Sequence, residues 1–324
     1  MARHLVTGGA GFIGSSIADA LLTAGESVRV VDDFSSGRRV NLQGFAERYG
    51  ARFELIEGTI VDPAVVARAV EGVEVIFHEA AIPSVTRSVE NPVATMLAGT
   101  QATTVLLDAA RHAEVKRVVF AASSSAYGDT PTLPKVETMR PAPLSPYALS
   151  KLACEELMRI FASLYGIETV SLRYFNVFGP RQDPASEYAA VIPKFVTAAL
   201  RKTRPIVFGD GEQTRDFCFI DNTVHANLLA ASSPKKLVGE VVNVACGARI
   251  SLNQLLSMIH DIAVARGIAD KGAKLAPEYR EARAGDVRDS LADITAASEL
   301  LGYAPKVEVR DGLERTFDAM RAVV

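Results

Sequence analysis

Tyr147 and Lys151, four residues apart in SPYALSK, form the pair in this sequence that most directly suggests chemistry. This spacing places both side chains on one face of a helix. A tyrosine hydroxyl ionises near pH ~10, so it acts as a base near neutrality only where a cation stabilises the phenolate. A lysine ammonium in a partly desolvated site can do so, whereas an exposed ion pair is too weak. The pair therefore predicts a base that takes a proton from a hydroxyl group.

A glycine-rich segment near the N-terminus indicates a second kind of chemistry. GGAGFIG places Gly8, Gly11 and Gly14 at three-residue steps between an apolar strand and a helix. Glycine permits a tight turn and lets the backbone approach a pyrophosphate at the start of the helix, where amide protons favour anions. The next apolar segment ends in Asp32, where a carboxylate can accept hydrogen bonds from a ribose. The pattern predicts a dinucleotide-binding site.

The charges around Asp32 favour one dinucleotide over the other. Asp32 and its neighbour Asp33 would repel a 2′-phosphate, which favours NAD over NADP. Arg38 and Arg39 lie a few residues further on and act in the opposite direction. We expect NAD as the cofactor.

An alternation of strands and helices must position these side chains. Apolar runs that end in turn residues recur through the first half of the chain, with helical periodicity between them. This alternation implies a parallel sheet covered on both faces. The predicted fold class is α/β, a Rossmann-type doubly wound parallel sheet with a smaller mixed α/β substrate lobe. Strands are expected at 4–7, 28–32, 53–58, 73–81, 117–124 and 168–175.

After Gly179 the alternation is less regular. Helices are expected at 189–201 and 221–232, two short strands around a glycine-rich turn within 206–220, and a further strand at 241–245. The chain is therefore expected to return to the first sheet. The predicted domains are a dinucleotide-binding domain at 1–175 with 218–247, and a second lobe at 176–217 and 248–324.

Length and composition exclude several classes of protein. With 324 residues, 48% hydrophobic and 23% charged, the chain can fold without disulfides or metals. A net charge of −3 without charged blocks argues against nucleic-acid binding, and no apolar run approaches the ~18 residues that cross a membrane. Three widely spaced cysteines favour a reducing compartment, so a cytoplasmic location is expected. The histidines lack metal-ligand spacing, so no metal site is expected at His4, His78, His112, His225 or His260.

Several motifs together resemble a known superfamily. SPYALSK, the SSSAYG segment about twenty residues upstream and the glycine loop are similar to the extended short-chain dehydrogenase/reductases, over nearly the whole chain. Within this superfamily the sequence most resembles the nucleotide-sugar 4-epimerases, and among these the UDP-N-acetylglucosamine 4-epimerases. The segments that carry this closer resemblance are AASSSAYGDTP, SPYALSK, LRYFNVFGPRQDP, TRDFCFI and GDVRDSLADI.

The resemblance implies NAD as cofactor, a UDP-sugar as substrate and a catalytic set of three residues. In this set, formed by Ser123, Tyr147 and Lys151, the serine would bind the oxygen that the tyrosine deprotonates. Hydride would pass from the sugar to NAD and return to the other face of a transient 4-keto sugar. Cofactor contacts are implied at Gly8, Gly11, Phe12, Ile13, Gly14, Asp32, Thr59, Ile60, Ala80, Ala81, Tyr147, Lys151 and Tyr174.

The resemblance also implies substrate contacts, mostly in the second lobe. Asn176 would meet the diphosphate, and Arg215 and Arg283 would clamp its oxygens, a task that suits guanidinium groups. Phe208 would cover the uracil and Asp286 would bind the uridine ribose. The full implied set is Ser123, Ser124, Ser125, Tyr147, Asn176, Val191, Phe208, Arg215, Arg283, Asp286 and Ser290.

Two features narrow the expected reaction. Related dehydratases carry acids where this chain has Ser124 and Ser125, so dehydration is not expected. Ser290 matches a gatekeeper position beside the sugar 2-substituent, and a small residue there leaves room for an N-acetyl group. We expect interconversion of UDP-GlcNAc and UDP-GalNAc, with weaker activity on plain UDP-hexoses. The alternatives are a UDP-glucuronate 4-epimerase and a non-catalytic NAD-binding protein, and retention of Tyr147 and Lys151 argues against the latter.

Two positions depart from the family pattern. Thr59 stands where an aspartate usually contacts the adenine, and Met96 stands where an asparagine is usual. These changes affect the expected tightness of NAD binding and the local helix packing. The segments 93–112 and 147–165 are apolar over more than one face, and family members pair these helices in a four-helix bundle. A homodimer is therefore expected.

Overall fold

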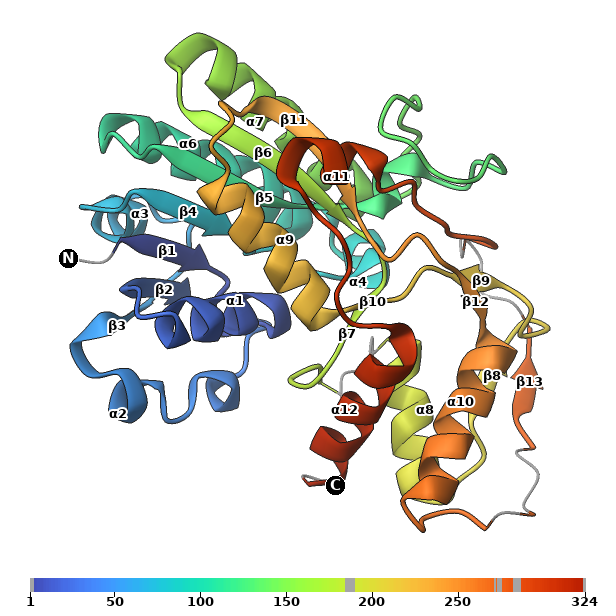
Figure 1. Cartoon of the computed structure of the whole chain (residues 1–324). Helices are drawn as coiled ribbons and strands as arrows, with labels where there is room; N and C mark the ends of the chain where they lie inside the picture. Colours follow the sequence, from blue (N-terminus) through green and yellow to red (C-terminus); the bar gives the residue numbers. More distant parts are fainter. Residues whose placement is uncertain (1–2, 184–189, 271, 273–275, 282–286, 323–324) are drawn as a thin grey trace.

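A computed structural model describes residues 3–183, 190–270, 272, 276–281 and 287–322 (Figure 1). At its centre is a seven-stranded sheet with the order β11-β6-β5-β4-β1-β2-β3, in which every neighbouring pair is parallel. The predicted Rossmann-type fold class is confirmed. The strands are β1 (His4–Thr7), β2 (Val28–Asp32), β3 (Phe53–Glu57), β4 (Val75–His78), β5 (Arg117–Ser123), β6 (Glu168–Tyr174) and β11 (Val238–Val244).

Burial along the strands explains why the first six were readable in the sequence. Every residue of β1 and of β2 is buried, as expected for parallel strands covered on both faces. β3 lies at the edge of the sheet and exposes most of its side chains. The observed strands end within a few residues of the predicted segments. The largest difference is at 73–81, where β4 spans only Val75–His78.

Helices cover the two faces of the sheet (Figure 1). One face packs against α3 (Pro63–Val70), α6 (Ala102–His112) and α7 (Pro146–Tyr165). The other face packs against α1 (Phe12–Thr23) and α9 (Ile220–Ser232). None of the described helices combines the length and apolar composition that a bilayer-spanning segment needs.

Short helices fill the connections of the first half. A π-helical turn, η3, continues directly from α5 and leads into α6, so these three form one continuous helical segment. The short elements are η1 (Arg39–Leu42), α2 (Phe45–Tyr49), η2 (Gly50–Arg52), α4 (Val85–Glu90), α5 (Pro92–Met96), η3 (Leu97–Gln101) and η4 (Ser124–Tyr127).

The second half builds a smaller lobe and also returns to the sheet. α9 packs on the sheet, and β11 pairs with β6 at the edge. The apolar core of the α1 and α9 face continues into the smaller lobe, so both parts share one core. The lobe's helices are α8 (Val191–Leu200), α10 (Leu252–Ala265) and α12 (Val309–Arg321), whereas α11 (Thr295–Leu301) packs against β11 of the main sheet and against α9.

The two short strands predicted around a glycine-rich turn within 206–220 are present, and Gly209 and Gly211, both with positive φ, lie in the turn between them. The segment also holds a third short strand, and each of the three pairs with a distant segment of the chain. A local turn signal cannot reveal such distant partners. The pairs are β8 (Ile206–Phe208) with β13 (Glu278–Arg280), β9 (Thr214–Arg215) with β12 (Ile250–Ser251), and β10 (Cys218–Phe219) with β7 (Val177–Phe178).

Candidate active site

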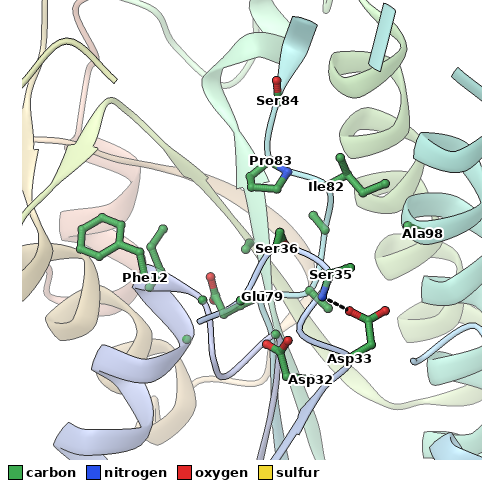
Figure 2. Close-up of a pocket in the computed structure, with 18 of the residues that line it drawn as sticks. Phe12, Asp32, Asp33, Ser35, Ser36, Glu79, Ile82, Pro83, Ser84 and Ala98 are labelled. Atoms are coloured by element: carbon green, nitrogen blue, oxygen red, sulfur yellow. Dashed lines mark hydrogen bonds between the residues drawn. The ribbon is translucent and has the colours of Figure 1, made fainter. Parts of the chain in front are cut away.

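A cavity of about 580 Å³ opens at the carboxyl ends of the central strands. The strand order reverses between β1 and β4, which is where doubly wound sheets bind their ligands. In Figure 2, Phe12 of α1 lies on one side of the cavity and Ala98 of η3 on the other, with Asp32 and Glu79 between them. Every predicted cofactor contact lines this cavity: Gly8, Gly11, Phe12, Ile13, Gly14, Asp32, Thr59, Ile60, Ala80, Ala81, Tyr147, Lys151 and Tyr174.

The glycine loop is shaped by close backbone contacts. Gly8 has a φ of 66°, and a Cβ atom there would lie 2.7 Å from the Cα of Ala80. A Cβ atom on Gly14 would collide with the carbonyl oxygen of Gly8. Gly11 caps α1 without any side-chain hydrogen bond, so no capping side chain covers the first amide groups of the helix. The loop thus presents the start of α1 to the cavity, an arrangement suited to binding phosphate.

Asp32, buried at the end of β2, holds the glycine loop in place. Its carboxylate accepts hydrogen bonds from the backbone N–H groups of Ala10 and Phe34, each at 2.8 Å. Burial raises the pKa of Asp32, and the two N–H groups act in the opposite direction. Each carboxylate oxygen has a second lone pair, so the group can also accept from a ligand.

Tyr147 and Lys151 enter the cavity from the first two turns of α7. Ser145 caps this helix by accepting from the N–H of Ala148 at 3.1 Å, and Pro146 occupies its first position. The buried ammonium of Lys151 donates to the carbonyl oxygen of Ala121 at 2.6 Å. The chain thus anchors the lysine to β5 and brings both members of the predicted pair to one cavity.

Ser123 lies at the end of β5, opposite Tyr174 in the register of the sheet. Its Oγ accepts from the N–H of Ser125 at 3.2 Å and from the Ser125 hydroxyl at 2.8 Å. The turn that follows Ser123, η4, ends at Tyr127, and the ring of Tyr127 lies 4.5 Å from the guanidinium of Arg173. Ser123, Ser124 and Ser125 are not among the residues that line the cavity.

Arg173 links that turn to α7. Its guanidinium donates to both carboxylate oxygens of Glu155, at 2.9 and 2.7 Å, and both side chains are buried. Glu155 is one turn beyond Lys151 on the same helix. This buried pair therefore fixes α7 relative to the strand end that carries Ser123.

Three residues of the predicted substrate set meet around β9, away from the cavity. Asn176 donates through Nδ2 to the carbonyl of Asp216 at 3.1 Å. Arg215 donates through Nη1 to the carbonyl of Thr214 at 2.9 Å, and the N–H of Ser290 donates to the same carbonyl at 3.1 Å. The structure therefore brings Asn176, Arg215 and Ser290 together, although they are far apart in the sequence.

The other predicted substrate contacts are dispersed. Val191 begins α8 and Phe208 ends β8, and neither lines the cavity, although Ala190 beside Val191 does. Arg283 and Asp286 lie outside the described residues. Of the described substrate set, Tyr147 alone lines the cavity.

Comparison with known proteins identifies the family. The model of the NAD dependent epimerase/dehydratase family matches residues 4–245, most of the chain. The UDP-glucose 4-epimerase of Mycolicibacterium smegmatis is 40% identical over 321 residues, which covers 98% of each protein. The chain belongs to the NAD-dependent epimerase/dehydratase family.

Solved structures show how similar this epimerase is to its relatives. It matches the UDP-N-acetylglucosamine 4-epimerase of Methanobrevibacter ruminantium with a TM-score of 0.91 and 35% identity, over 100% of this chain and 99% of that one. It matches the UDP-glucuronic acid 4-epimerase of Bacillus cereus, in complex with UDP-glucuronic acid and NAD, with a TM-score of 0.89 and 30% identity, over 99% of both chains. The predicted enzyme class, an isomerase, and the predicted cofactor, NAD, are confirmed.

Glu79 is a cavity residue of the epimerase that the motif reasoning missed. Its Oε1 accepts from the hydroxyl of Tyr174 at 2.9 Å, and that hydroxyl accepts from the amide of Asn227 at 2.8 Å. Burial raises the pKa of Glu79 to about 7, while the Tyr174 hydrogen bond and the charge of Lys151 act in the opposite direction. The signal in the sequence was an acid directly after the buried strand β4, in HEAA.

The positions that depart from the family pattern lie at or near the cavity. Thr59 lines it, and its hydroxyl accepts from the N–H of Val61 at 3.4 Å. Met96 ends α5, and the π-helical turn that follows brings Ala98 to the cavity wall. Such π-helical turns often occur at functional sites.

Histidines and acids in the described part of the chain do not gather as metal ligands do. The fully buried His78 illustrates their structural role. Its two ring nitrogens pair with the hydroxyls of Thr7 and Thr103, each at 2.8 Å, and burial lowers its pKa to about 3. His78 is therefore neutral and joins β4 to β1 and α6.

Proposed function

We propose that this epimerase interconverts UDP-N-acetylglucosamine and UDP-N-acetylgalactosamine, with plain UDP-hexoses as weaker substrates. The observation that carries the proposal is that Tyr147 and Lys151 enter the cavity lined by every predicted NAD contact. Similarity over the full chain to a UDP-N-acetylglucosamine 4-epimerase supports the substrate class. The backbone N–H of Ser290 donates to Thr214, in the strand that carries Arg215. The small side chain of Ser290 at this place supports the preference for an N-acetylated sugar.

The shape of the cavity fits NAD. Gly8 and Gly14 let the loop pack closely on Ala80 and on its own backbone, and the start of α1, which no side chain caps, faces the cavity, as a pyrophosphate requires. Asp32, which lines the same cavity and accepts from the N–H of Ala10 in the loop, would bind the adenosine ribose. Once bound, NAD supplies a hydride acceptor that is regenerated within the same turnover.

The protein's own residues then manage the proton. Lys151, anchored by the carbonyl of Ala121, would stabilise the phenolate of Tyr147, which takes the proton of the sugar 4-hydroxyl. Ser123 accepts from the Ser125 hydroxyl and would donate its own O–H to the same sugar oxygen. Rotation of the 4-keto sugar would present its other face for the return of the hydride to C4, and Tyr147 would return the proton to the 4-oxygen, which together complete the inversion.

The nucleotide half of the substrate would lie against the smaller lobe. We assign residues 1–175 with 218–247 to NAD and residues 176–217 with 248–324 to the UDP-sugar, and the pairing of β11 with β6 supports this division. Asn176 and Arg215, which meet around β9, would bind the diphosphate. Val191 and Phe208 would flank the uridine. The proposed roles of Arg283 and Asp286 rest on their sequence motif.

Incubation of the purified protein with UDP-GlcNAc, UDP-Glc and UDP-glucuronate, without added NAD, tests the proposal. Separation of the products should show UDP-GalNAc as the main product. Faster conversion of UDP-glucuronate would favour the alternative that the structural similarity to the Bacillus cereus enzyme supports. Conversion of none of the three would exclude the proposed activity and leave a non-catalytic NAD-binding protein.

We also propose a homodimer in which the helical segment 93–112, formed by α5, η3 and α6, and the segment 147–165 of α7 pair with their copies in a four-helix bundle. Apolar side chains on this side of the molecule are unusually exposed, including Val93 at 67%, Leu97 at 42% and Leu164 at 69%. Exposed apolar residues that gather on neighbouring helices are typical of an interface. Sedimentation of the protein at micromolar concentration should give the mass of a dimer, and a monomer would contradict the proposal.

A further inference from the structure

Asp216 is a fully buried acid at the centre of the residues assigned to the substrate. Its Oδ1 accepts from the N–H of Cys246 at 2.9 Å, and its Oδ2 accepts from the N–H groups of Gly247 at 3.1 Å and Ala292 at 3.3 Å. Its backbone carbonyl accepts from the side chain of Asn176 at 3.1 Å. One residue thus joins four segments that are distant in the sequence.

Each of these segments leads to the proposed substrate site. Arg215 precedes Asp216 directly in the chain, and Asn176 binds the Asp216 carbonyl. Ala292 is two residues beyond Ser290, whose N–H binds Thr214 in the strand next to Asp216. Cys246 and Gly247 follow β11, the edge strand of the main sheet. The carboxylate therefore connects the sheet to the segments that carry Arg215 and Ser290.

We propose that Asp216 is a positioning residue that sets the geometry of Asn176, Arg215 and Ser290 for the UDP-sugar. The inference rests on the proposed function, because that function assigns these three side chains to the substrate. Asp216 itself touches no substrate: its carboxylate is buried among backbone N–H groups. Its effect on the reaction is therefore indirect, through the backbone that it holds.

The charge of Asp216 matters for this role. Burial raises its pKa to about 6, and the backbone N–H groups around it act in the opposite direction. Above this pH the carboxylate is ionised, and an ionised carboxylate accepts hydrogen bonds at both oxygens with greater strength than an amide. The experiment is therefore set at pH 8.

The test measures UDP and NAD binding separately, by calorimetry, in the full chain. In Asp216→Asn the amide must turn an NH₂ group toward at least one N–H donor, since both carboxylate oxygens accept from the backbone. We expect UDP affinity to fall about tenfold or more and NAD affinity to change less than about twofold. Asp216→Ser, which removes the carboxylate without adding an NH₂ group, should show the same selective loss.

Asp293→Asn is the matched control. This carboxylate also accepts from a backbone N–H, that of Thr295 at 2.8 Å, and lies next to Ala292, but it is only half-buried and this hydrogen bond is exposed. We expect no change in UDP affinity. The enzyme assay should show a raised KM for the UDP-sugar with a smaller change in kcat for Asp216→Asn.

The outcomes separate the inference from the proposed function. A wild-type protein that binds NAD but no UDP would contradict the proposed function. UDP binding that is equal in wild type and both Asp216 variants would overturn the inference alone. Equal loss of UDP and NAD affinity, with a lower melting temperature, would show that Asp216 only stabilises the fold, and this would also overturn it.

Discussion

The cofactor cavity and the residue group around β9 are built in different ways. The cavity is assembled from short segments that each follow a strand: the glycine loop after β1, Asp32 at the end of β2 and Glu79 after β4. The group around β9 depends on hydrogen bonds between residues about 40 to 75 positions apart, such as those of Asn176 with Asp216 and of Ser290 with Thr214. A local motif can specify the first kind of site, whereas the second depends on tertiary contacts.

The largest loss of activity is expected when the proposed base in the cavity, Tyr147, is replaced. In Tyr147→Phe the proposed base is lost while the ring is kept, and we expect turnover to fall by about 10³-fold with NAD affinity preserved. Product formation and NAD binding are measured on the same preparation. Tyr165→Phe, which changes an exposed tyrosine on the same helix, serves as control and should keep normal turnover. Near wild-type activity in Tyr147→Phe would show that another group takes the proton.

The second largest effect should come from the glycine loop. Gly8→Ala adds a Cβ 2.7 Å from the backbone of Ala80 at a positive φ, so we expect NAD affinity to fall roughly tenfold to a hundredfold. Gly44→Ala is the control, because Gly44 also has a positive φ but nothing lies within 4 Å of its added Cβ. That control should lower the melting temperature slightly and leave NAD affinity unchanged. Equal effects of both variants would mean that strain alone, rather than crowding, controls NAD binding.

A selective effect is expected in the smaller lobe. Ser290→Tyr should reduce kcat/KM for UDP-GlcNAc about tenfold relative to UDP-Glc, because a large side chain would fill the space beside the N-acetyl group. The ratio of the two kcat/KM values is measured in one assay series. Equal loss on both substrates would show that residue 290 affects the lobe's packing instead of the sugar's 2-substituent.

The smallest effect concerns the charge of Glu79. Its folded pKa of about 7 lies above the ordinary value of 4.5, so the folded protein holds this proton more tightly than the unfolded chain. Stability from this group is complete below pH 4.5 and falls as pH rises through about 7, by about 3 kcal/mol in total. Glu79→Gln does not lose this stability, so its melting temperature relative to wild type should rise by about 4 °C between pH 5 and pH 8.5. A pH-independent difference between the two proteins would contradict the assignment.

Most residues of the cofactor cavity could be predicted from the sequence because short motifs of neighbouring residues mark them. Gly8, Gly11 and Gly14 read as a phosphate loop from spacing alone, and the structure places all three at the cavity. Glu79 was missed because an acid after a strand has no motif of its own, and its significance depends on Tyr174 and Asn227 from other elements. The partners of β8, β9 and β10 could not be predicted, because each of these short strands pairs with a distant segment of the chain.

The sequence by itself determined the parallel sheet, the glycine loop and the placement of Tyr147 and Lys151 on one helix face, since strand burial and helical spacing are properties of neighbouring residues. Tertiary structure alone decided how Arg215, Asn176 and Ser290 come together and that Asp216 holds their segments. A buried carboxylate needs several donors, and here they come from the backbone at 246, 247 and 292. Only folding brings those donors to one place.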